Sequence, residues 1–491
     1  MEPVAFQPSM ILAILPEIGL VALAAVVLLL DIAWRNRGAA RRNLGWVTAG
    51  GLLVVLALTI AFARPADAPQ LIFGGMLRLD GMAFVFRLVF VMGAALTALF
   101  AMEHEPVGRH GEFYGLLLLA TLGMNLMAAS ADLVMLYLAI ETTSLPLYVM
   151  AGFKTRDPRS TEAGIKYFLF GAMTSAVMLY GFSLLFGLTG VTNLYAMAGQ
   201  ITAGTLAPAL PLLAAVLVLV GFGFKVSAVP FHFWAPDVYE GAPTPVAGFL
   251  STASKAAGFA VLMRVLVAVF PTQTAELLDW RVLVGVLALA SMIIGNILAI
   301  VQKNIKRLLA YSSIAQAGYM LVGVAAGSEL GAAGVTFYLL SYLVTNLAAF
   351  GIVELVGRTL CSDDLDAYAG LQRRNPNLAL ALLVALLSLG GIPPLSGFVG
   401  KLLVFGAAVQ SGTLGIVLAF VGVLTSVVAL YYYLTILKIV YVQPSAPDAR
   451  PLPVSPPWRV ALVVCVAFIL FMGTVIGPWF GLSTLGASGL F

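Results

Sequence analysis

Long apolar runs, separated by short polar connections, repeat along the whole chain. A run of roughly 20 apolar residues, at 1.5 Å per residue, is the length of a helix that crosses the hydrocarbon core of a bilayer. The runs lie near residues 10–30, 44–63, 81–102, 112–130, 132–152, 162–187, 208–229, 246–270, 280–301, 307–327, 330–357, 377–410, 412–442 and 458–481. The pattern predicts an all-α polytopic membrane protein of about fourteen transmembrane helices.

Three segments need a separate interpretation. Residues 192–206 (TNLYAMAGQITAGTL) are too few and too mixed to span, so we expect a lateral helix at the membrane interface. The Pro-rich segment 444–457 is expected to be a loop. The first residues, MEPVAFQPSM, lack the basic stretch of a signal peptide. We therefore expect the first apolar run to be a spanning helix and not a cleaved signal.

Composition narrows the class of protein. The 491 residues are 61% hydrophobic and 10% charged, whereas soluble domains carry roughly 25% charged residues. The net charge of +4 does not indicate nucleic acid, because the basic residues are scattered. Cys361 and Cys465 form no ligand-spaced pair, and the sequence contains no P-loop and no GxGxxG after a strand. We expect no flavin, nucleotide, metal, iron–sulfur cluster or haem on this chain.

The basic residues divide unequally between the two sets of loops. Loops that join an odd-numbered span to the next carry 16 of the 26 basic residues, and the other loops carry Arg64, Arg78 and Arg281. The 16 are Arg35, Arg37, Arg41, Arg42, Arg109, Lys154, Arg156, Arg159, Lys303, Lys306, Arg307, Arg358, Arg373, Arg374, Arg450 and Arg459. Cytoplasmic loops are enriched in Lys and Arg. The bias therefore predicts a cytoplasmic side for the richer set and a periplasmic side for both termini.

Four charged residues fall deep inside predicted spans. Glu141 lies about 12 Å into its helix by the rise of 1.5 Å per residue. Lys225, Lys255 and Lys401 also lie near the middle of apolar runs. Each such charge costs at least roughly 2.5–3.5 kcal/mol on insertion scales, so it needs a reason. One interpretation is structural ion pairing, and the other is a relay in which neighbouring charges and burial set when each group binds a proton.

Two of the spans contain prolines that should break them. Pro230 and Pro236 follow Lys225, and Pro393 and Pro394 precede Lys401. Proline removes a helical hydrogen bond, and the freed backbone survives at membrane depth where protein or a water-filled cavity surrounds it. Chance kinks are the alternative.

The broken spans are the seventh and the twelfth, so they run in opposite directions through the membrane. This favours two inverted five-helix repeats, spans 4–8 and 9–13. Within one transmembrane domain, 1–491, we expect the following parts: an N-terminal group of three helices (1–103), a first repeat (112–270), a second repeat (280–442) and a C-terminal helix (458–491).

At these residues the chain resembles the antiporter-like subunits of respiratory complex I, which are related to Mrp-type Na⁺/H⁺ antiporters. The resemblance covers nearly the whole chain and rests on LYLAIETTSLPLYVMAGF, GFKVSAVPFHFWAPDVYEGAPTPVAGFLSTASKAAGF, NIKRLLAYSSIAQAGYM and SLGGIPPLSGFVGK. The string FWAPDVYEGAPTPV and the lysine in span twelve are most similar to the subunit N type, whereas M-type chains carry glutamate there.

The resemblance implies roles for individual residues. It makes Glu141 and Lys225 the pair of the first repeat, Lys255 the central link and Lys401 the exit-side lysine. Lys166 matches a further family lysine, although a position near the cytoplasmic end also fits an ordinary snorkelling side chain. His232, beside the Pro230 break, has a side chain that titrates near neutrality, and a purely structural histidine is the alternative.

Several other polar residues within the spans are expected to be structural. We expect Arg87, Arg264 and Glu354 to be packing or interface charges, and Glu17 to face a neighbouring subunit. The three consecutive tyrosines, Tyr431, Tyr432 and Tyr433, are expected to pack as ordinary span residues.

The resemblance also implies an assembly. It makes the chain a proton-translocating inner-membrane subunit of a bacterial NADH–quinone oxidoreductase, beside an M-like chain, small K- and J-like chains and lipids. NADH, FMN, iron–sulfur clusters and quinone would be used elsewhere in the complex. The alternatives are a subunit of an Mrp-type cation/proton antiporter and the membrane subunit of an energy-converting hydrogenase.

Overall fold

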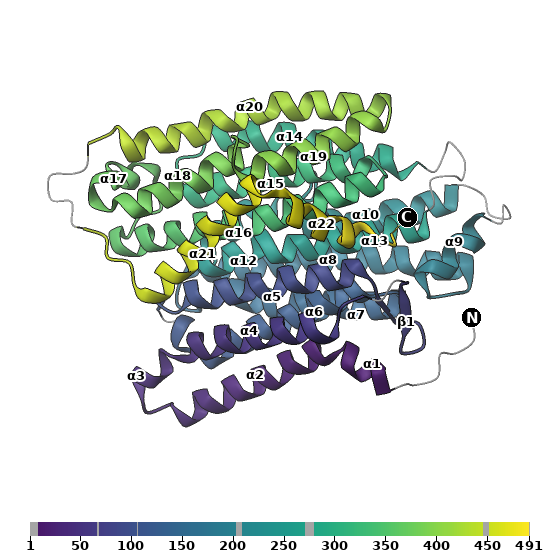
Figure 1. The fold of residues 1–491 in the computed structure, drawn as a ribbon, viewed down its shortest axis with the longest axis horizontal. Coiled ribbons are helices and arrows are strands. Elements are labelled where there is room, and N and C mark those ends of the chain that lie inside the picture. The colour runs from purple at the N-terminus through teal and green to yellow at the C-terminus, as the bar shows by residue number, and fades with distance from the viewer. Residues whose placement is uncertain are drawn as a thin grey trace.

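The computed structural model describes residues 8–65, 68–105, 107–202, 209–270, 279–444 and 451–490. In these residues it is a bundle of long helices that run side by side (Figure 1). The first part of the chain contains α1 (Pro8–Ala13), α2 (Leu15–Ala33), α3 (Gly38–Arg41), α4 (Leu44–Phe62), β1 (Gln70–Ile72), β2 (Leu77–Leu79) and α5 (Gly81–Ala101). The two strands pair antiparallel, with Leu71 opposite Arg78.

The middle of the chain holds the first broken helix. Its elements are η1 (Val107–Arg109), α6 (Gly111–Ala129), α7 (Leu133–Ala151), α8 (Pro158–Thr189), α9 (Leu194–Thr202), α10 (Ala209–Val226), α11 (Trp234–Gly241), α12 (Thr244–Phe249), η2 (Leu250–Ser254) and α13 (Lys255–Val269). The segment 227–233, which contains Pro230, separates α10 from α11. The segment η2 is a π-helical turn inside an otherwise continuous helix.

The remaining chain holds the second broken helix. Its elements are α14 (Trp280–Ile300), α15 (Ile305–Ala325), α16 (Glu329–Leu360), η4 (Leu365–Tyr368), α17 (Leu371–Arg374), α18 (Pro376–Gly390), α19 (Ser396–Gln410), α20 (Thr413–Tyr441), α21 (Pro456–Thr474) and α22 (Ile476–Ala487). Residues 391–395, with Pro393 and Pro394, separate α18 from α19.

The helices confirm the predicted all-α polytopic class. Thirteen described helices are long and apolar enough to cross a membrane, and the shorter pair α18 and α19 accounts for the expected span at 377–410. Several boundaries differ from expectation. The first span begins as the separate helix α1, the last one divides into α21 and α22, and a small hairpin follows α4. A helix, α9, is present in the segment 192–206, where a lateral helix was expected. Residues 203–208 and 445–450 lie outside the described ones.

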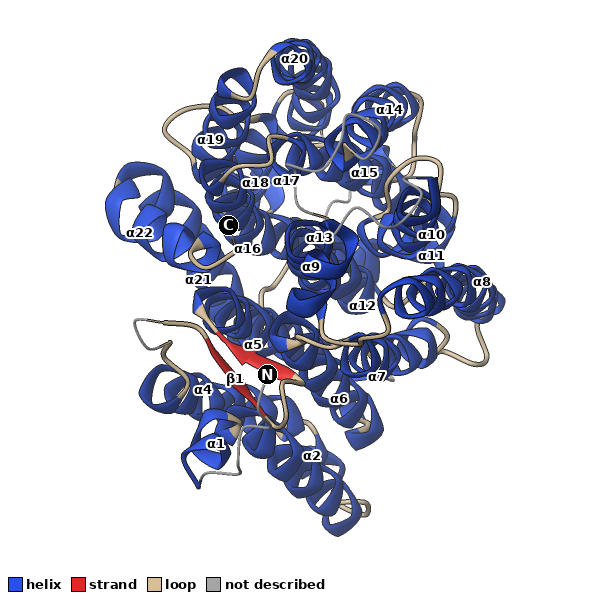
Figure 2. Cartoon of the chain, turned by 90° about the vertical axis from the view of Figure 1, so that its right-hand side faces the viewer, coloured by secondary structure: helices blue, strands red, loops and turns tan. Residues whose placement is uncertain are grey.

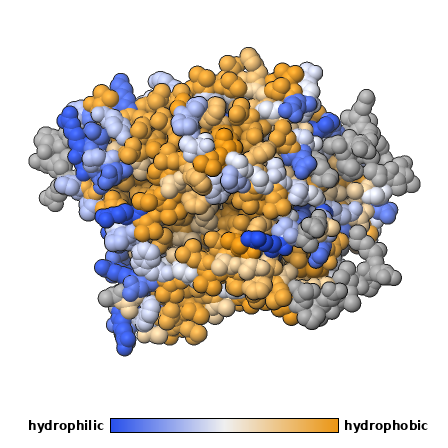
Figure 3. Space-filling model, in the orientation of Figure 1, coloured by the Kyte–Doolittle hydropathy of each residue, from blue (hydrophilic) through white to orange (hydrophobic). Residues whose placement is uncertain are grey.

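Alternate loops lie at the same end of the bundle, as the positive-residue count requires. In Figure 1, α3 and α17 lie at the left end, whereas β1 and α9 lie at the right. One polar pocket is lined by Glu105, Lys154, Glu240, Lys303 and Arg358, which come from five different odd-to-even connections. Hydrophilic residues gather at the left-hand rim, and apolar residues cover the middle of the face (Figure 3).

The core lies around α16. The most apolar stretch of α16 is buried throughout, and most of α15 and of the α12–α13 helix is also buried, whereas α20 and α8 present much of their apolar surface outward. Figure 2, which looks along the bundle, places α13 and α16 in the middle and α2, α8, α14 and α20 at the rim. The apolar outer faces fit a lipid surrounding. Polar residues on α13, α15 and α16 are enclosed by protein, because these helices lie in the core.

Candidate functional site

The first buried lysine is held where α10 stops. Lys225 occupies the last turn of α10, just before the break, and is 6% exposed. The last carbonyl groups of a helix have no partner within the helix and carry partial negative charge, which favours a cation at this end. The Lys225 ammonium donates a hydrogen bond to the Ser144 hydroxyl of α7.

Glu141 lies one turn before Ser144 on α7. Its carboxylate accepts a hydrogen bond from the Ser175 hydroxyl of α8. Among the described residues, no ion pair joins Glu141 directly to Lys225: Lys225 binds Ser144, Glu141 binds Ser175, and no hydrogen bond joins these two serines. A hydroxyl both donates and accepts, so Ser144 and Ser175 can pass a proton as well as hold the charged groups.

Lys255 begins α13 directly after the π-helical turn. It is 2% exposed, and its ammonium donates to the Ser313 carbonyl of α15 at 3.1 Å and also to the Ser313 hydroxyl. A π-helical turn displaces the side chains around it and is frequent at functional sites. Gly258, one turn later, packs its Cα against Lys225, where an added Cβ would lie 3.1 Å from the Lys225 Cβ. Lys225 therefore packs against the side of α13 that carries Lys255.

Lys401 lies across the second helix break. Its ammonium donates to the Gly390 carbonyl at 3.2 Å, so it caps the carbonyl end of α18 although it belongs to α19. The ammonium also lies 4.7 Å from the centroid of the Tyr319 ring, within cation–π range. Gly391 has a φ of +83°, and a Cβ there would lie 2.9 Å from the Lys401 Cδ. Lys225 and Lys401 thus occupy the same kind of place, the carbonyl end of a half-helix.

One face of α15 connects Lys255 to Lys401. Ser312 and Ser313 lie one turn before Gln316. Ser313 binds Lys255, whereas Ser312 hydrogen-bonds the Tyr433 hydroxyl, which accepts at 3.2 Å from the Gln316 amide. That amide also donates to the Leu389 carbonyl at 3.0 Å, one residue before the carbonyl that holds Lys401. These groups form a polar line that extends from one lysine toward the other, although no hydrogen bond among the described residues joins Ser312 to Ser313.

The tyrosines of α20 differ from expectation. Tyr433 belongs to the polar line, and Tyr432 donates to the Asn296 side chain of α14 at 3.1 Å. Both are buried, and Tyr431 is exposed. Ordinary packing is therefore too simple an account of Tyr432 and Tyr433, since a tyrosine buried in a span normally needs a partner for its hydroxyl.

The two less certain relay residues lie in different surroundings. His232 is buried in the break between α10 and α11, and its Nδ1 has no partner among the described residues. Lys166 lies outside the buried line. Its ammonium forms ion pairs with Asp237 of α11 at 2.6 Å and with Glu162 at 2.7 Å, and Arg307 binds the other oxygen of Asp237 at 2.8 Å.

Two other buried charges pair within the chain. Glu17 does not face outward to a neighbour as expected, because Arg87 of α5 binds its carboxylate at 2.8 Å. Arg264 of α13 binds both oxygens of Asp80, at 2.7 and 2.9 Å, which ties α13 to the start of α5. These contacts make Arg87 and Arg264 packing charges, as predicted.

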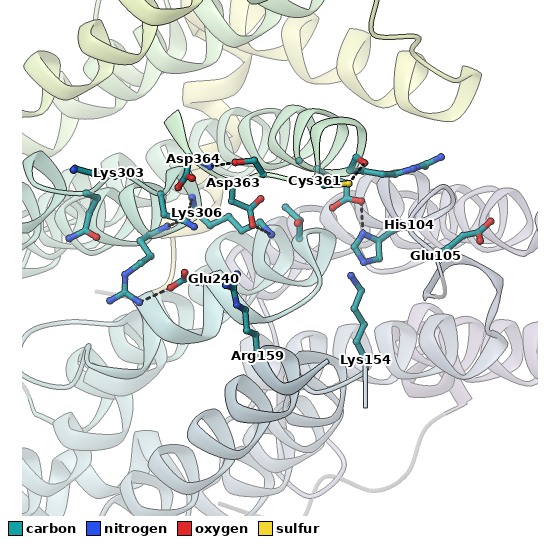
Figure 4. A pocket seen from close by; sticks show the side chains of 18 residues that line it. His104, Glu105, Lys154, Arg159, Glu240, Lys303, Lys306, Cys361, Asp363 and Asp364 are labelled. Atoms are coloured by element: carbon teal, nitrogen blue, oxygen red, sulfur yellow. Dashed lines mark hydrogen bonds and ion pairs between the residues drawn. The ribbon is translucent and has the colours of Figure 1, made fainter. Parts of the chain in front are cut away.

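A polar pocket of about 950 Å³ opens at the end of the bundle that holds the basic loops (Figure 4). His104 and Glu354 hydrogen-bond at its wall, and Lys154 points toward His104. Burial lowers the pKa of Lys154 below its ordinary value, although the nearby Glu354 carboxylate opposes the shift. The pocket brings titratable groups to the beginning of α12, the helix that leads to Lys255.

Comparisons with known proteins place the chain in a family. Residues 130–428 match the family model described as "NADH:quinone oxidoreductase/Mrp antiporter, TM". The chain belongs to this family. It is 43% identical to the NADH-quinone oxidoreductase subunit N of Heliobacterium modesticaldum, over 94% of this chain and 96% of that one. It is also 43% identical to the NAD(P)H-quinone oxidoreductase subunit 2 of a Synechococcus strain, over 96% and 90% of the two chains.

Solved structures of the family have the same fold. A chain of respiratory complex I from Thermus thermophilus superposes with a TM-score of 0.76 at 36% identity, over 94% of this chain and 98% of that one. A chain of the Mrp complex from a Dietzia species superposes with a TM-score of 0.81 at 23% identity and over 97% of this chain, although this chain covers 52% of it. The second likeness is one of fold alone.

The structure adds residues that the sequence did not single out. Ser144, Ser175, Ser313 and Gln316 hold the charged groups or connect them. The one signal for them was position: each lies on a predicted span, and Ser144 follows Glu141 by three residues. Serine is common in membrane helices, where its hydroxyl bonds the preceding turn, so its presence alone indicates no function.

Proposed function

We infer that this chain is the proton-translocating membrane subunit of an NADH–quinone oxidoreductase. Relatives named subunit N, matched over nearly their whole length, carry this inference, together with the fold shared with a chain of respiratory complex I. As part of that enzyme, the chain couples electron transfer on other subunits to proton movement. The Mrp-type alternative has less support, since the matching Mrp chain is 23% identical.

The buried polar line gives the chain a route for protons. Glu141 and Lys225 form the first relay site through Ser144 and Ser175. Lys255 receives the proton from Lys225 and transfers it along α15, past Ser312 and Gln316, to Lys401. Lysine suits this task because its ammonium can release a proton when burial disfavours the charge, and the serine, glutamine and tyrosine groups of the line can bridge between charged groups.

The less certain residues take positions beside this route. His232 lies in the first break, close to the line, and is a candidate for proton exchange between the break and Lys255. Lys166, in its surface ion-pair cluster, fixes α11 against α8 and α15 rather than carrying the proton. The helix break at Pro393–Pro394 provides the Gly390 carbonyl that binds Lys401, and the break at Pro230 ends α10 one residue after Lys225.

The two halves of the route belong to two inverted repeats, 112–270 and 280–442. In each proposed repeat the third helix is 32 residues long (α8 and α16), and the fourth is broken beside a lysine. Residues 1–103 and 458–491 flank the repeats. A ligand site at the junction of two such repeats is the usual design of secondary transporters.

Family membership and the charge count support a proposal for the surroundings of the chain. The chain lies in the bacterial inner membrane, with the basic loops in the cytoplasm and both termini in the periplasm, from the 16-to-3 count of basic residues. An M-like chain, small K- and J-like chains and lipids are its neighbours. NADH, FMN, iron–sulfur clusters and quinone act on other subunits of the complex.

The test measures NADH-driven proton uptake by the reconstituted complex. Lys225→Ala removes the first lysine, and Glu141→Gln removes its carboxylate while keeping the shape. Both variants should assemble and should pump far less per electron, because each removes a proton-binding group from a series path. Thr474→Ala, on the outer surface of α21, is the control. Parental pumping by both assembled variants would show that Glu141 and Lys225 are structural.

A further inference from the structure

An apolar groove with a polar mouth lies between α18 and α21. It is a cavity of about 810 Å³, which falls in the size range of ligand sites. Its walls are apolar side chains of the two helices, among them Leu380 of α18 and Val463, Ala467 and Leu470 of α21. Leu380, Val463 and Leu470 are each more than 40% exposed, so the groove faces outward from the bundle.

Polar groups gather at one end of this groove. Arg459, Asn375 and Asn377 line it there, and the lining contains no acidic residue. Asn375 builds the rim: its amide donates to the Leu452 carbonyl at 2.8 Å, and its side-chain oxygen accepts from the Leu378 amide at 3.0 Å. The side chains of Arg459 and Asn377 have no hydrogen bond or ion pair within the described residues, so both can bind a ligand.

The mouth is electrostatically positive. Helix α18 begins at Pro376 and α21 at Pro456, so the positive ends of two helix dipoles meet the Arg459 guanidinium there. Arg373 and Arg374 immediately precede the rim residue Asn375. An anion is the ligand that such a mouth favours, and guanidinium binds phosphate with two hydrogen bonds.

The length of the groove matches one leaflet of a bilayer. Arg459 and Leu470 are eleven residues apart on α21, which at 1.5 Å per residue is roughly 16 Å. Half of the hydrocarbon core is roughly 15 Å. A ligand that bound here would have a negative head at the level of Arg459 and an apolar tail about one leaflet long.

We propose that the groove between α18 and α21 binds one anionic phospholipid, whose phosphate pairs with Arg459 and Asn377 and whose acyl chain lies along Val463, Ala467 and Leu470. The arginine and the groove occur together at the end of the bundle that carries the basic loops, so the lipid belongs to the leaflet on that side. Because α18 carries the carbonyl group that binds Lys401, the lipid would also support the second broken helix.

The experiment uses the intact complex and lipids of known composition. Complexes reconstituted with phosphatidylglycerol or with phosphatidylcholine are extracted, and retained lipid is counted by native mass spectrometry. Arg459→Gln removes the positive head site and Ala467→Trp fills the groove. The matched controls are Arg156→Gln, an exposed arginine at the same end of the bundle, and Val427→Trp, on the outward face of α20.

Each site variant should retain one phosphatidylglycerol molecule fewer than the parent complex and than its own control. Equal retention by all variants, or equal retention of phosphatidylcholine and phosphatidylglycerol at this site, would overturn the proposal. A photo-crosslinker at Val463 that labels a neighbouring subunit in place of lipid would also overturn it, because the groove would then be a protein interface. These outcomes do not depend on whether Lys225 and Glu141 carry protons.

Discussion

A buried lysine and a buried arginine differ in what they can do with a proton. Lysine loses its proton readily when burial disfavours the charge, whereas arginine stays protonated in proteins. In this chain the buried arginines and the buried lysines have different partners. Arg87 and Arg264 each bind a carboxylate and tie helices together, whereas Lys225 and Lys401 bind neutral hydroxyl or carbonyl groups. A lysine with neutral partners keeps both protonation states available.

Lys401→Arg tests whether Lys401 transfers protons or only holds the broken helix in place. Arginine retains the positive charge that caps α18 but does not release its proton. We therefore expect an assembled complex whose proton pumping falls by an order of magnitude or more relative to the parent. The control is Lys438→Arg, at the end of α20 and outside the polar line. NADH-driven proton uptake in vesicles, with subunit content checked, is the measurement. Near-normal pumping by the arginine variant would exclude Lys401 as a proton carrier.

Lys154 provides a test of the pocket outside the spans. Burial lowers its pKa below the ordinary 10.5, with Glu354 opposing the shift. A lower pKa means that the free amine, which is the reactive form, appears at a lower pH. In competitive acetylation over a pH series, read by peptide mass spectrometry, the midpoint for Lys154 should lie below 10.5. In the Glu354→Gln variant the midpoint should move lower still, because the opposing charge is gone. A midpoint at or above 10.5 would contradict the buried position.

At the scale of elements, each interruption of a helix lies next to a buried lysine. The second proline break supplies a carbonyl group for Lys401, the first break ends α10 just after Lys225, and the π-helical turn precedes Lys255. A continuous α-helix would satisfy the Gly390 carbonyl within itself and remove this hydrogen-bond partner from the Lys401 ammonium. The irregular backbone at the second break therefore helps to make the buried Lys401 tolerable in the span.

Gly391→Ala tests the second break. A left-handed φ costs a non-glycine residue roughly 1–2 kcal/mol. The new Cβ would also lie 2.9 Å from the Lys401 Cδ and push that side chain aside. We expect a lower thermal midpoint of the complex and reduced pumping together. Gly406→Ala in α19, whose Cβ would meet no atom within 4 Å, should lower neither. Unchanged pumping by Gly391→Ala would indicate that the position of Lys401 relative to α18 does not matter.

The sequence predicted the spans and lysines well because both have strong physical signals. A span needs a long apolar run, and a charge inside one is costly, so Glu141 and Lys255 stand out in the letters alone. Proline marked both breaks. The π-helical turn at Leu250–Ser254 has no such signal, since its residues are ordinary helix residues. The hairpin could have been found from Gly74 and Gly75, both of which have positive φ values in its turn.

Partnerships were harder to predict than positions. Glu17 was expected to face a neighbour, and the structure pairs it with Arg87, seventy residues away in sequence. Ser313 and Tyr433 are hydrogen-bonded to groups on other helices, 58 and 121 residues from Lys255 and Ser312 respectively. Side chains this far apart meet only through the packing of the helices, so a linear pattern of polar residues does not determine which of them bind each other.

At the scale of the whole molecule, the two ends of the bundle are chemically different. The end that holds α3 and α17 carries the basic loops and the polar pocket, and the other end carries the hairpin and α9 (Figure 1). The proposed proton route must connect the two sides of the membrane, so its direction depends on which end faces the cytoplasm. From the bias of basic residues we propose that the α3 and α17 end faces the cytoplasm.

Cysteine labelling in intact cells tests this orientation. Single cysteines in place of Arg37, Arg156, Lys303 and Arg373, all exposed at the basic end, should escape a membrane-impermeant thiol reagent from outside and react in inverted vesicles. The four variants are made in a protein that carries Cys361→Ser, because Cys361 is exposed in the polar pocket and would itself react. Cys465 is buried and can stay. Arg64→Cys, exposed at the opposite end, should react in intact cells and serves as the positive control. Outside labelling of any two of the four would reverse the orientation. The polar pocket beside Lys154 would then face the periplasm, and the proposed order from Glu141 to Lys401 would have to run the other way.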